Sequence, residues 1–134
     1  MTEVFVDTFH WLSLMNPRDT FHQHVLQMSK PPRMVTTQAV QLEVMDAFCD
    51  PRYRGLATEF GRQTTADESL VIVPLETDLL NRSVTFFEKH RDKAWSMTDC
   101  ISFVVMKDRG IADALTRDHH FEQAGFHILS PVDT

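Results

Sequence analysis

Five short runs of β-branched and aromatic residues alternate along the chain with longer segments whose apolar residues recur at helical spacing. The first run, EVFVDT, is typical of a strand that ends in polar residues. The third run, SLVIVP, is continuously apolar, which predicts a strand covered on both faces. The predicted strands are residues 3–8, 33–36, 69–74, 111–115 and 126–129.

The segments between these strands predict helices, because their apolar residues fall three and four positions apart. Leu79, Leu80, Val84 and Phe87 form one such pattern. Asn16, which precedes a proline, predicts the N-cap of another helix. The predicted helices are residues 9–15, 17–29, 38–49, 53–65, 77–90 and 98–107, with a helical turn near 120–124.

This alternation predicts an α/β fold with a central parallel sheet and helices on both faces, because parallel strands are joined by right-handed helical crossovers. The 134 residues fit one domain, and we expect it to span residues 1–134. In such sheets, ligands bind beyond the carboxyl ends of the strands. Functional residues are therefore expected near the carboxyl ends of the strands.

The amino-acid composition excludes fewer functions than the pattern of strands and helices does. Hydrophobic residues make up 43% of the chain and charged residues 24%, which argues against disorder. The formal net charge of -6 argues against a nucleic-acid-binding protein, since phosphates are usually contacted by Lys and Arg. That objection weakens if several acids are functional and bind a cation.

The location we expect is the cytoplasm, without contact to a membrane. No apolar run approaches the roughly 18 residues of a membrane-spanning helix, and the start of the chain is acidic, unlike a signal peptide. Cys49 and Cys100 lie in apolar helical patterns, which predicts two buried thiols in a reducing compartment.

Three aspartates are predicted at one edge of the sheet. Asp7 ends the first strand, Asp99 begins a helix, and Asp118 follows the fourth strand. Each has a simpler explanation: Asp7 could cap the next helix, Asp99 could form a capping box with Ser96, and Asp118 could be a surface loop residue. Taken singly, each aspartate favours that simpler role.

Glu43 differs, because it lies within a largely apolar helix. It is three residues after Val40 and four before Ala47, so it is predicted on the apolar side of the helix. A buried carboxylate without a partner is costly. A cation or a basic side chain should therefore accompany Glu43, whereas its neighbour Asp46 is expected in solvent.

Together, Asp7, Glu43, Asp99 and Asp118 indicate a metal site. Carboxylates packed close together repel one another, and a hard divalent cation such as Mg²⁺ or Mn²⁺ removes the repulsion and works with phosphates. Histidine pairs at 22/24 and 119/120 are too close in sequence to share a ligand on a regular helix. Arginines 52, 54 and 62 could contact RNA phosphates, but a solvated helix face explains them better.

Four segments of the chain resemble the motifs of the PIN-domain family. VFVDT resembles the family's opening strand, and TTQAV leading to Glu43 resembles its second strand and acidic helix. WSMTDCISF is similar to its third acidic motif, and ALTRDHHF with the later AGF is similar to its C-terminal motif. The family often has Ser where this chain has Phe9.

This resemblance implies a three-layer α/β/α fold and an endoribonuclease that depends on Mg²⁺ or Mn²⁺ and leaves a 5′-phosphate. It places the four metal-binding and catalytic acids at Asp7, Glu43, Asp99 and Asp118. It also implies a toxin of the VapBC type, with RNA as substrate, a small antitoxin protein as partner, and a homodimer.

Two other functions are weighed against the ribonuclease. A non-catalytic module could bind RNA or protein on the same fold, although a pure binder of RNA would gain by losing these acids. A metal-dependent phosphatase of another doubly wound fold often needs a second Asp two residues after the first. Phe9 occupies that position here, which counts against a phosphatase.

Overall fold

The sheet is parallel throughout and has the strand order β3-β2-β1-β4-β5. The computed structural model describes residues 2–130 of the chain. Each predicted strand is present, although most are shorter than the sequence pattern suggests. The strands are β1 (Val4–Val6), β2 (Met34–Thr37), β3 (Leu70–Val73), β4 (Asp113–Leu115) and β5 (His127–Leu129).

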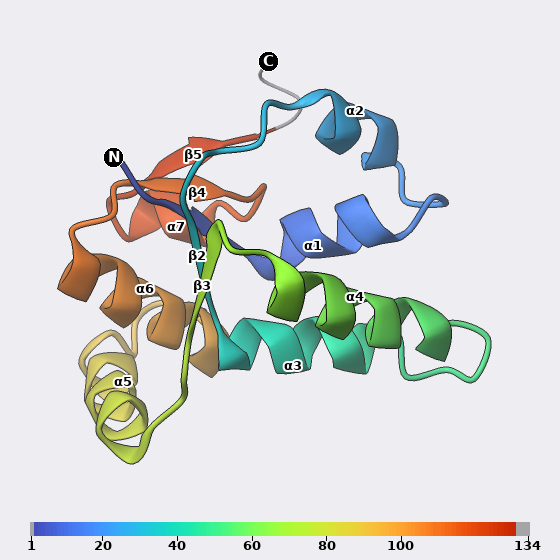
Figure 1. The fold of residues 1–134 in the computed structure, drawn as a ribbon. Coiled ribbons are helices and arrows are strands. Elements are labelled where there is room, and N and C mark those ends of the chain that lie inside the picture. The colour runs from blue at the N-terminus through green and yellow to red at the C-terminus, as the bar shows by residue number, and fades with distance from the viewer. Residues whose placement is uncertain (1, 131–134) are drawn as a thin grey trace.

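Helices connect all successive strands of the sheet (Figure 1). Within residues 2–130, none combines the length and the apolar content needed to cross a bilayer. The helices are α1 (Thr8–Met15), α2 (His22–Gln27), α3 (Gln38–Ala47), α4 (Arg54–Ala66), α5 (Thr77–Lys89), α6 (Met97–Arg109) and α7 (His120–Gln123).

The register of the strands separates two layers of helices. Met34 and Leu115 pair with alternate residues of β1 and so lie on one face, where α1, α2 and α4 surround a cavity of about 270 Å³ beside them. Phe5 points to the other face, where its ring centroid lies 6.2 Å from that of Phe121 in α7. Helices therefore cover both faces, and the predicted three-layer α/β/α architecture is confirmed.

An aromatic cluster fills the core on the α6 and α7 side. Phe103 is fully buried, and its ring centroid lies 5.0 Å from Trp95, 4.9 Å from Phe121 and 5.7 Å from Phe126. These rings come from α6, from α7 and from the segments that flank them. The cluster thus packs α6 against α7.

The predicted helix over residues 17–29 is wrong in its first part, because α2 begins only at His22. The preceding residues form turns in which the Asp19 carboxylate accepts a hydrogen bond of 2.8 Å from the backbone N–H of Phe21. Asn16 likewise accepts from a backbone N–H two residues on, so it stabilises a turn and does not cap a helix.

Two burial predictions are also wrong. β3 lies at an edge of the sheet, so its apolar run is not covered on both faces, and Val71 keeps 38% of its surface exposed. Cys49 is exposed just beyond the end of α3, whereas Cys100 in α6 is buried as predicted. The apolar residues around Cys49 and in β3 did not indicate that the end of α3 and this strand lie at the periphery of the fold.

Candidate active site

Asp7 lies at the end of β1, where the strand passes into α1. Although Asp7 is the N-cap residue of α1, its side chain makes no capping hydrogen bond. The carboxylate instead accepts a hydrogen bond of 2.9 Å from the hydroxyl of Thr116, which follows the neighbouring strand β4. The simple capping role therefore does not explain Asp7.

Burial of Asp7 perturbs its acidity. Only 5% of its surface is exposed, and this burial is the main reason that the pKa of its carboxyl rises from 3.8 to about 7. The charges of Asp99 and Asp118 raise the pKa further, while the Thr116 hydrogen bond lowers it. These two aspartates are thus close enough to Asp7 for like-charge repulsion.

Asp99 holds the start of α6 and faces the site at the same time. It forms the predicted capping box with Ser96, in which each side chain accepts from the other residue's backbone N–H. Its Oδ2 also lies 3.1 Å from Nδ1 of His120. Burial, followed by the charge of Asp118, raises the pKa of Asp99. The capping role is therefore real, but it leaves this carboxylate within the acidic cluster.

Asp118 follows β4 and connects the other two aspartates. Its backbone N–H donates to the Thr116 hydroxyl at 3.0 Å, and that hydroxyl in turn donates to Asp7. Its Oδ1 accepts from the backbone N–H of His120 at 2.9 Å and lies 3.3 Å from the imidazole Nδ1. A continuous set of contacts therefore runs from Asp7 through Asp118 and His120 to Asp99.

Glu43 reaches the same place from α3, but it is exposed, so the prediction that it faces the apolar side is wrong. Val40 and Val44 occupy the buried face of the helix. Glu43 lies beside that face, and its Oε1 accepts a hydrogen bond of 2.5 Å from the hydroxyl of Thr8. Since Thr8 directly follows Asp7, this bond brings the fourth acid to the cluster.

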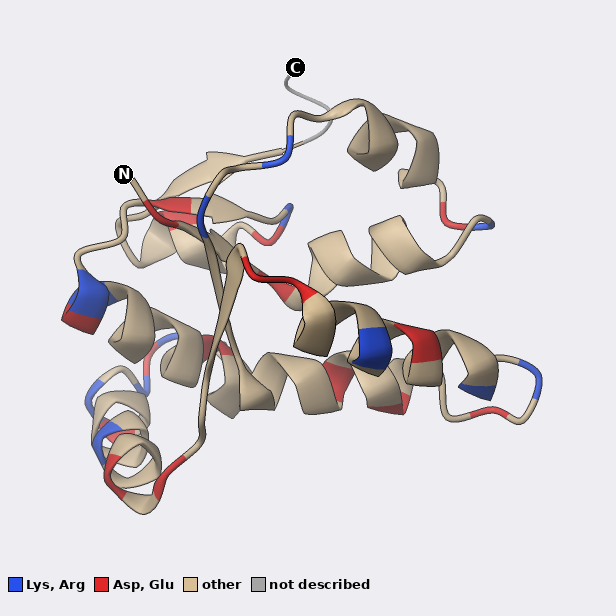
Figure 2. Cartoon of the chain, viewed as in Figure 1, with Lys and Arg blue, Asp and Glu red and all other residues tan. Residues whose placement is uncertain are grey.

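Three of the four acids, Asp7, Glu43 and Asp118, line one shallow, open pocket of about 500 Å³. Asp99 is not among the lining residues of this pocket, but it is linked to Asp118 through His120. Elsewhere, Lys and Arg are spread over helices and loops among the acids and do not gather on one element (Figure 2). Three of the predicted acids therefore share one pocket, and the fourth, Asp99, contacts them through His120. The group lies near the carboxyl ends of the strands, where ligands bind in such sheets.

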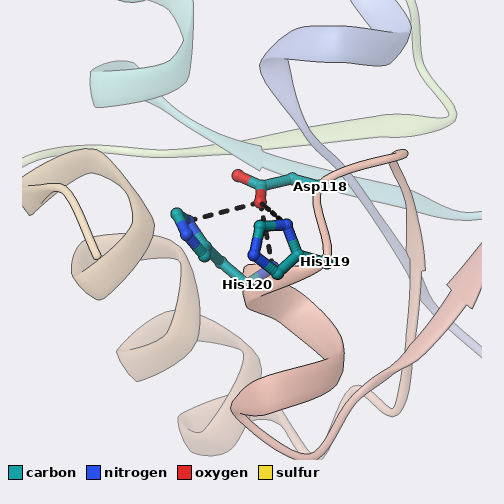
Figure 3. A group of neighbouring side chains, drawn as sticks. All are labelled: Asp118, His119 and His120. Carbon is teal, nitrogen blue, oxygen red and sulfur yellow. Dashed lines mark hydrogen bonds and ion pairs between the residues drawn. The ribbon is translucent and has the colours of Figure 1, made fainter. Parts of the chain in front are cut away.

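Two histidines lie beside Asp118 (Figure 3). One possible ligand atom from each of Asp118, His119 and His120 falls within 4.8 Å of the others, which is close enough to hold a metal ion. The two histidines were predicted not to share a ligand on a regular helix, but His119 is the N-cap residue of α7 and does not lie within the helix. His119 is exposed, whereas His120 is turned toward Asp99 and Asp118.

Thr8, Thr116 and His120 contact the acids and were not predicted from the sequence as part of the site. Thr116 carries a local signal, because a threonine hydroxyl often accepts from the N–H two residues on, as it does here from Asp118. Its bond to Asp7 spans 109 positions and has no such signal. The role of His120 likewise depends on α6 and α7 lying together.

The chain is similar to known proteins over nearly its full length. The chain is similar to the 23S rRNA-specific endonuclease VapC20 of Mycobacterium tuberculosis, with 29% identity in an alignment of 133 residues that covers 96% of this chain and 98% of the relative. The crystal structure of VapC20, described as a sarcin-ricin loop cleaving toxin, matches with a TM-score of 0.84 and 26% identity over 92% of this chain and 95% of that one.

More distant structures show the same fold. VapBC2 from Rickettsia felis, bound to a promoter DNA fragment, matches with a TM-score of 0.67 and 9% identity over 96% of this chain and 98% of that one. FitAcB from Neisseria gonorrhoeae matches with a TM-score of 0.66 and 12% identity over 98% and 99% of the two chains. The PIN-domain model itself matches residues 4–127, and the chain therefore belongs to the PIN-domain family.

Proposed function

We propose that this protein is a VapC-type endoribonuclease that hydrolyses RNA phosphodiesters with a divalent metal ion. The observation that carries the proposal is the joining of Asp7, Glu43, Asp99 and Asp118 at one edge of the sheet through Thr8, Thr116 and His120. The similarity to an endonuclease over nearly the full length of both chains supports it.

The residues present fit Mg²⁺ or Mn²⁺. Carboxylate oxygens are the ligands that these hard cations prefer. Asp7 and Asp99 both have raised pKa values, caused first by burial and then by like charges, and a bound cation would oppose both effects by stabilising the ionised carboxylates. When bound, such an ion acidifies water and offsets negative charge on the phosphate. The proposed ligands are Asp7, Glu43, Asp99 and Asp118, which are also the proposed catalytic residues.

Neighbouring side chains would hold these acids in place during the reaction. Thr116 fixes the Asp7 carboxylate, and His120 fixes both Asp99 and Asp118. Because Asp7 and Asp99 are buried, they cannot turn toward solvent when the site is empty of substrate. A site prepared in this way loses little free energy to reorganisation when RNA binds.

For the substrate, we infer the sarcin-ricin loop of 23S rRNA, because the relative that matches this chain over 98% of its length is specific for 23S rRNA. The protein would then act in the cytoplasm, where ribosomes are. A small antitoxin protein is the proposed partner, since the same fold occurs in a solved VapBC assembly. A homodimer remains an expectation from the family resemblance.

Incubation of the purified protein with bacterial ribosomes and with a sarcin-ricin loop hairpin tests this function. We expect a single Mn²⁺-dependent cut that leaves a 5′-phosphate and that stops when EDTA is added. Induction of the protein in a bacterium should arrest growth, and co-expression of a small antitoxin protein encoded next to it should relieve the arrest. A protein that binds Mn²⁺ and RNA but leaves every RNA intact would instead be a non-catalytic module.

Metal binding should depend on pH in a defined direction. Because the pKa of Asp7 is raised to about 7, the carboxyl is protonated at lower pH and a metal ion must displace that proton. The Mn²⁺ affinity should therefore fall about tenfold for each pH unit below about 7. Calorimetric titrations between pH of about 5 and 8 measure this slope. An affinity that stays constant over this range would contradict the assignment of Asp7 as a ligand.

A further inference from the structure

Arg117 lies between Thr116 and Asp118 and is held by two aromatic rings. Its guanidinium carbon is 3.7 Å from the ring centroid of Phe21 and 5.5 Å from that of Phe9. The two rings are themselves 5.6 Å apart. The three side chains therefore form a stack, although they come from the loop after β4, the residue before α2 and the first turn of α1.

This stack stands at the edge of the acidic pocket. Phe9 and Arg117 line it together with Asp7, Glu43 and Asp118, and Arg117 is the one Lys or Arg among its described lining residues. The rings of Phe9 and Phe21 thus support Arg117 directly beside the acids of the pocket.

Arg117 makes no ion pair with any residue in the range 2–130, despite its acidic surroundings. Arg52, Arg82 and Arg109, by contrast, each pair with a carboxylate. An aromatic ring takes up the flat face of a guanidinium group and leaves the N–H donors at its edge available. Those donors match the two oxygens of a phosphate in bidentate geometry.

The charge of the protein makes such a group valuable. With a net charge of -6, the protein as a whole repels RNA, and most favourable contacts to phosphate must come from individual cations near the site. A bound metal ion would offset the pocket carboxylates, so that they would not compete with RNA for Arg117. The geometry points to Arg117, supported by Phe21 and Phe9, as the residue that binds an RNA phosphate adjacent to the one that is cut.

This inference rests on the proposed function, so its test separates RNA binding from cleavage. RNA binding is measured by fluorescence anisotropy with a labelled sarcin-ricin loop hairpin, in an Asp7→Asn background that is expected not to cut. Arg117→Ala should weaken binding about tenfold. It should also reduce the slope of the logarithm of RNA affinity against the logarithm of salt concentration by about one. Arg117→Lys should recover only part of the affinity, because a lysine cannot bind phosphate bidentately.

Arg33→Ala is the matched control. Arg33 is exposed and directly precedes β2, so it lies at the amino ends of the strands, whereas the acids lie near their carboxyl ends. This variant therefore loses the same charge at a distance from the site. We expect its RNA affinity and salt dependence to equal those of the background protein. Phe21→Leu, which removes the aromatic face and keeps an apolar side chain, should weaken RNA binding as Arg117→Ala does.

Cleavage kinetics provide a second readout in the wild-type background. Arg117→Ala should raise KM about tenfold and change kcat little, because a flanking phosphate is held equally in the ground and transition states. Its Mn²⁺ affinity should be unchanged. The inference is overturned if Arg117→Ala behaves like Arg33→Ala, if its main effect is on Mn²⁺ affinity, or if it loses only a protein partner. If no protein, the wild type included, cuts RNA but the binding difference persists, the proposed function fails, whereas the assignment of Arg117 as a phosphate-binding residue stands.

Discussion

Replacement of Asp7 by Asn should abolish RNA cleavage and, at the same time, stabilise the metal-free protein. The loss of activity, on the order of 10³-fold, follows because the substitution removes a negative charge that would bind the metal ion. Asn has nearly the same shape and can still accept the hydrogen bond from Thr116. The fold should therefore survive the substitution.

The gain in stability follows from the raised pKa of Asp7. In the unfolded chain this carboxyl ionises near 3.8, whereas burial and neighbouring acids raise its pKa in the folded protein to about 7. Between these values the folded state binds the additional proton, so the stability of the wild type falls as pH rises through this window. Well above pH 7, the ionised carboxylate costs up to about 4 kcal/mol, less any relief from solvent penetration.

Urea denaturation of both proteins in EDTA measures this difference. The free energy of unfolding of Asp7→Asn should exceed that of the wild type by about 2–4 kcal/mol near pH 8, and the two should converge near pH 4. Added Mn²⁺ should stabilise only the wild type appreciably. Asp92→Asn, an exposed position, is the control and should change neither activity nor stability. An Asp7→Asn variant that still cuts RNA, or that is less stable near pH 8, would contradict the proposed site.

Truncation of Phe103 to Ala should have the largest destabilising effect among single substitutions in the α6 layer. The ring is fully buried and contacts the rings of Trp95 and Phe121 at centroid distances of 5.0 and 4.9 Å. Its removal leaves a cavity that rigid aromatic neighbours cannot fill. The expected loss in the free energy of unfolding is about 3–5 kcal/mol.

Activity should fall as well, because this cluster positions the acids. Phe103 is one helical turn after Asp99, and Phe121 directly follows His120. Loosening the contact between α6 and α7 should therefore disturb the 3.1 Å contact of His120 with Asp99. Phe87→Ala on α5, where the residue is 42% exposed, is the matched control and should cost less than about 1 kcal/mol. Equal losses of activity and of stability in the two variants would show that the aromatic cluster does not position the acids.

Much of the fold could be predicted because its signals are local. The alternation of strand and helix patterns led to a parallel sheet with helices on both faces, and the capping box of Ser96 and Asp99 was visible from their spacing alone. The same logic placed Asp7 and Asp118 at one edge of the sheet, since each follows a strand. Local reasoning failed where the margin of the fold decided burial, as at Glu43 and Cys49.

The sequence by itself determined the order of the elements, the ends of most helices and the candidate acids. These features depend on backbone geometry and on hydrogen bonds within about four residues. Only the tertiary structure decided how the acids are joined, how acidic Asp7 is, and that Arg117 rests on Phe21 and Phe9. Those properties arise between segments far apart in the chain, where burial and neighbouring charges come from residues that no local pattern can place.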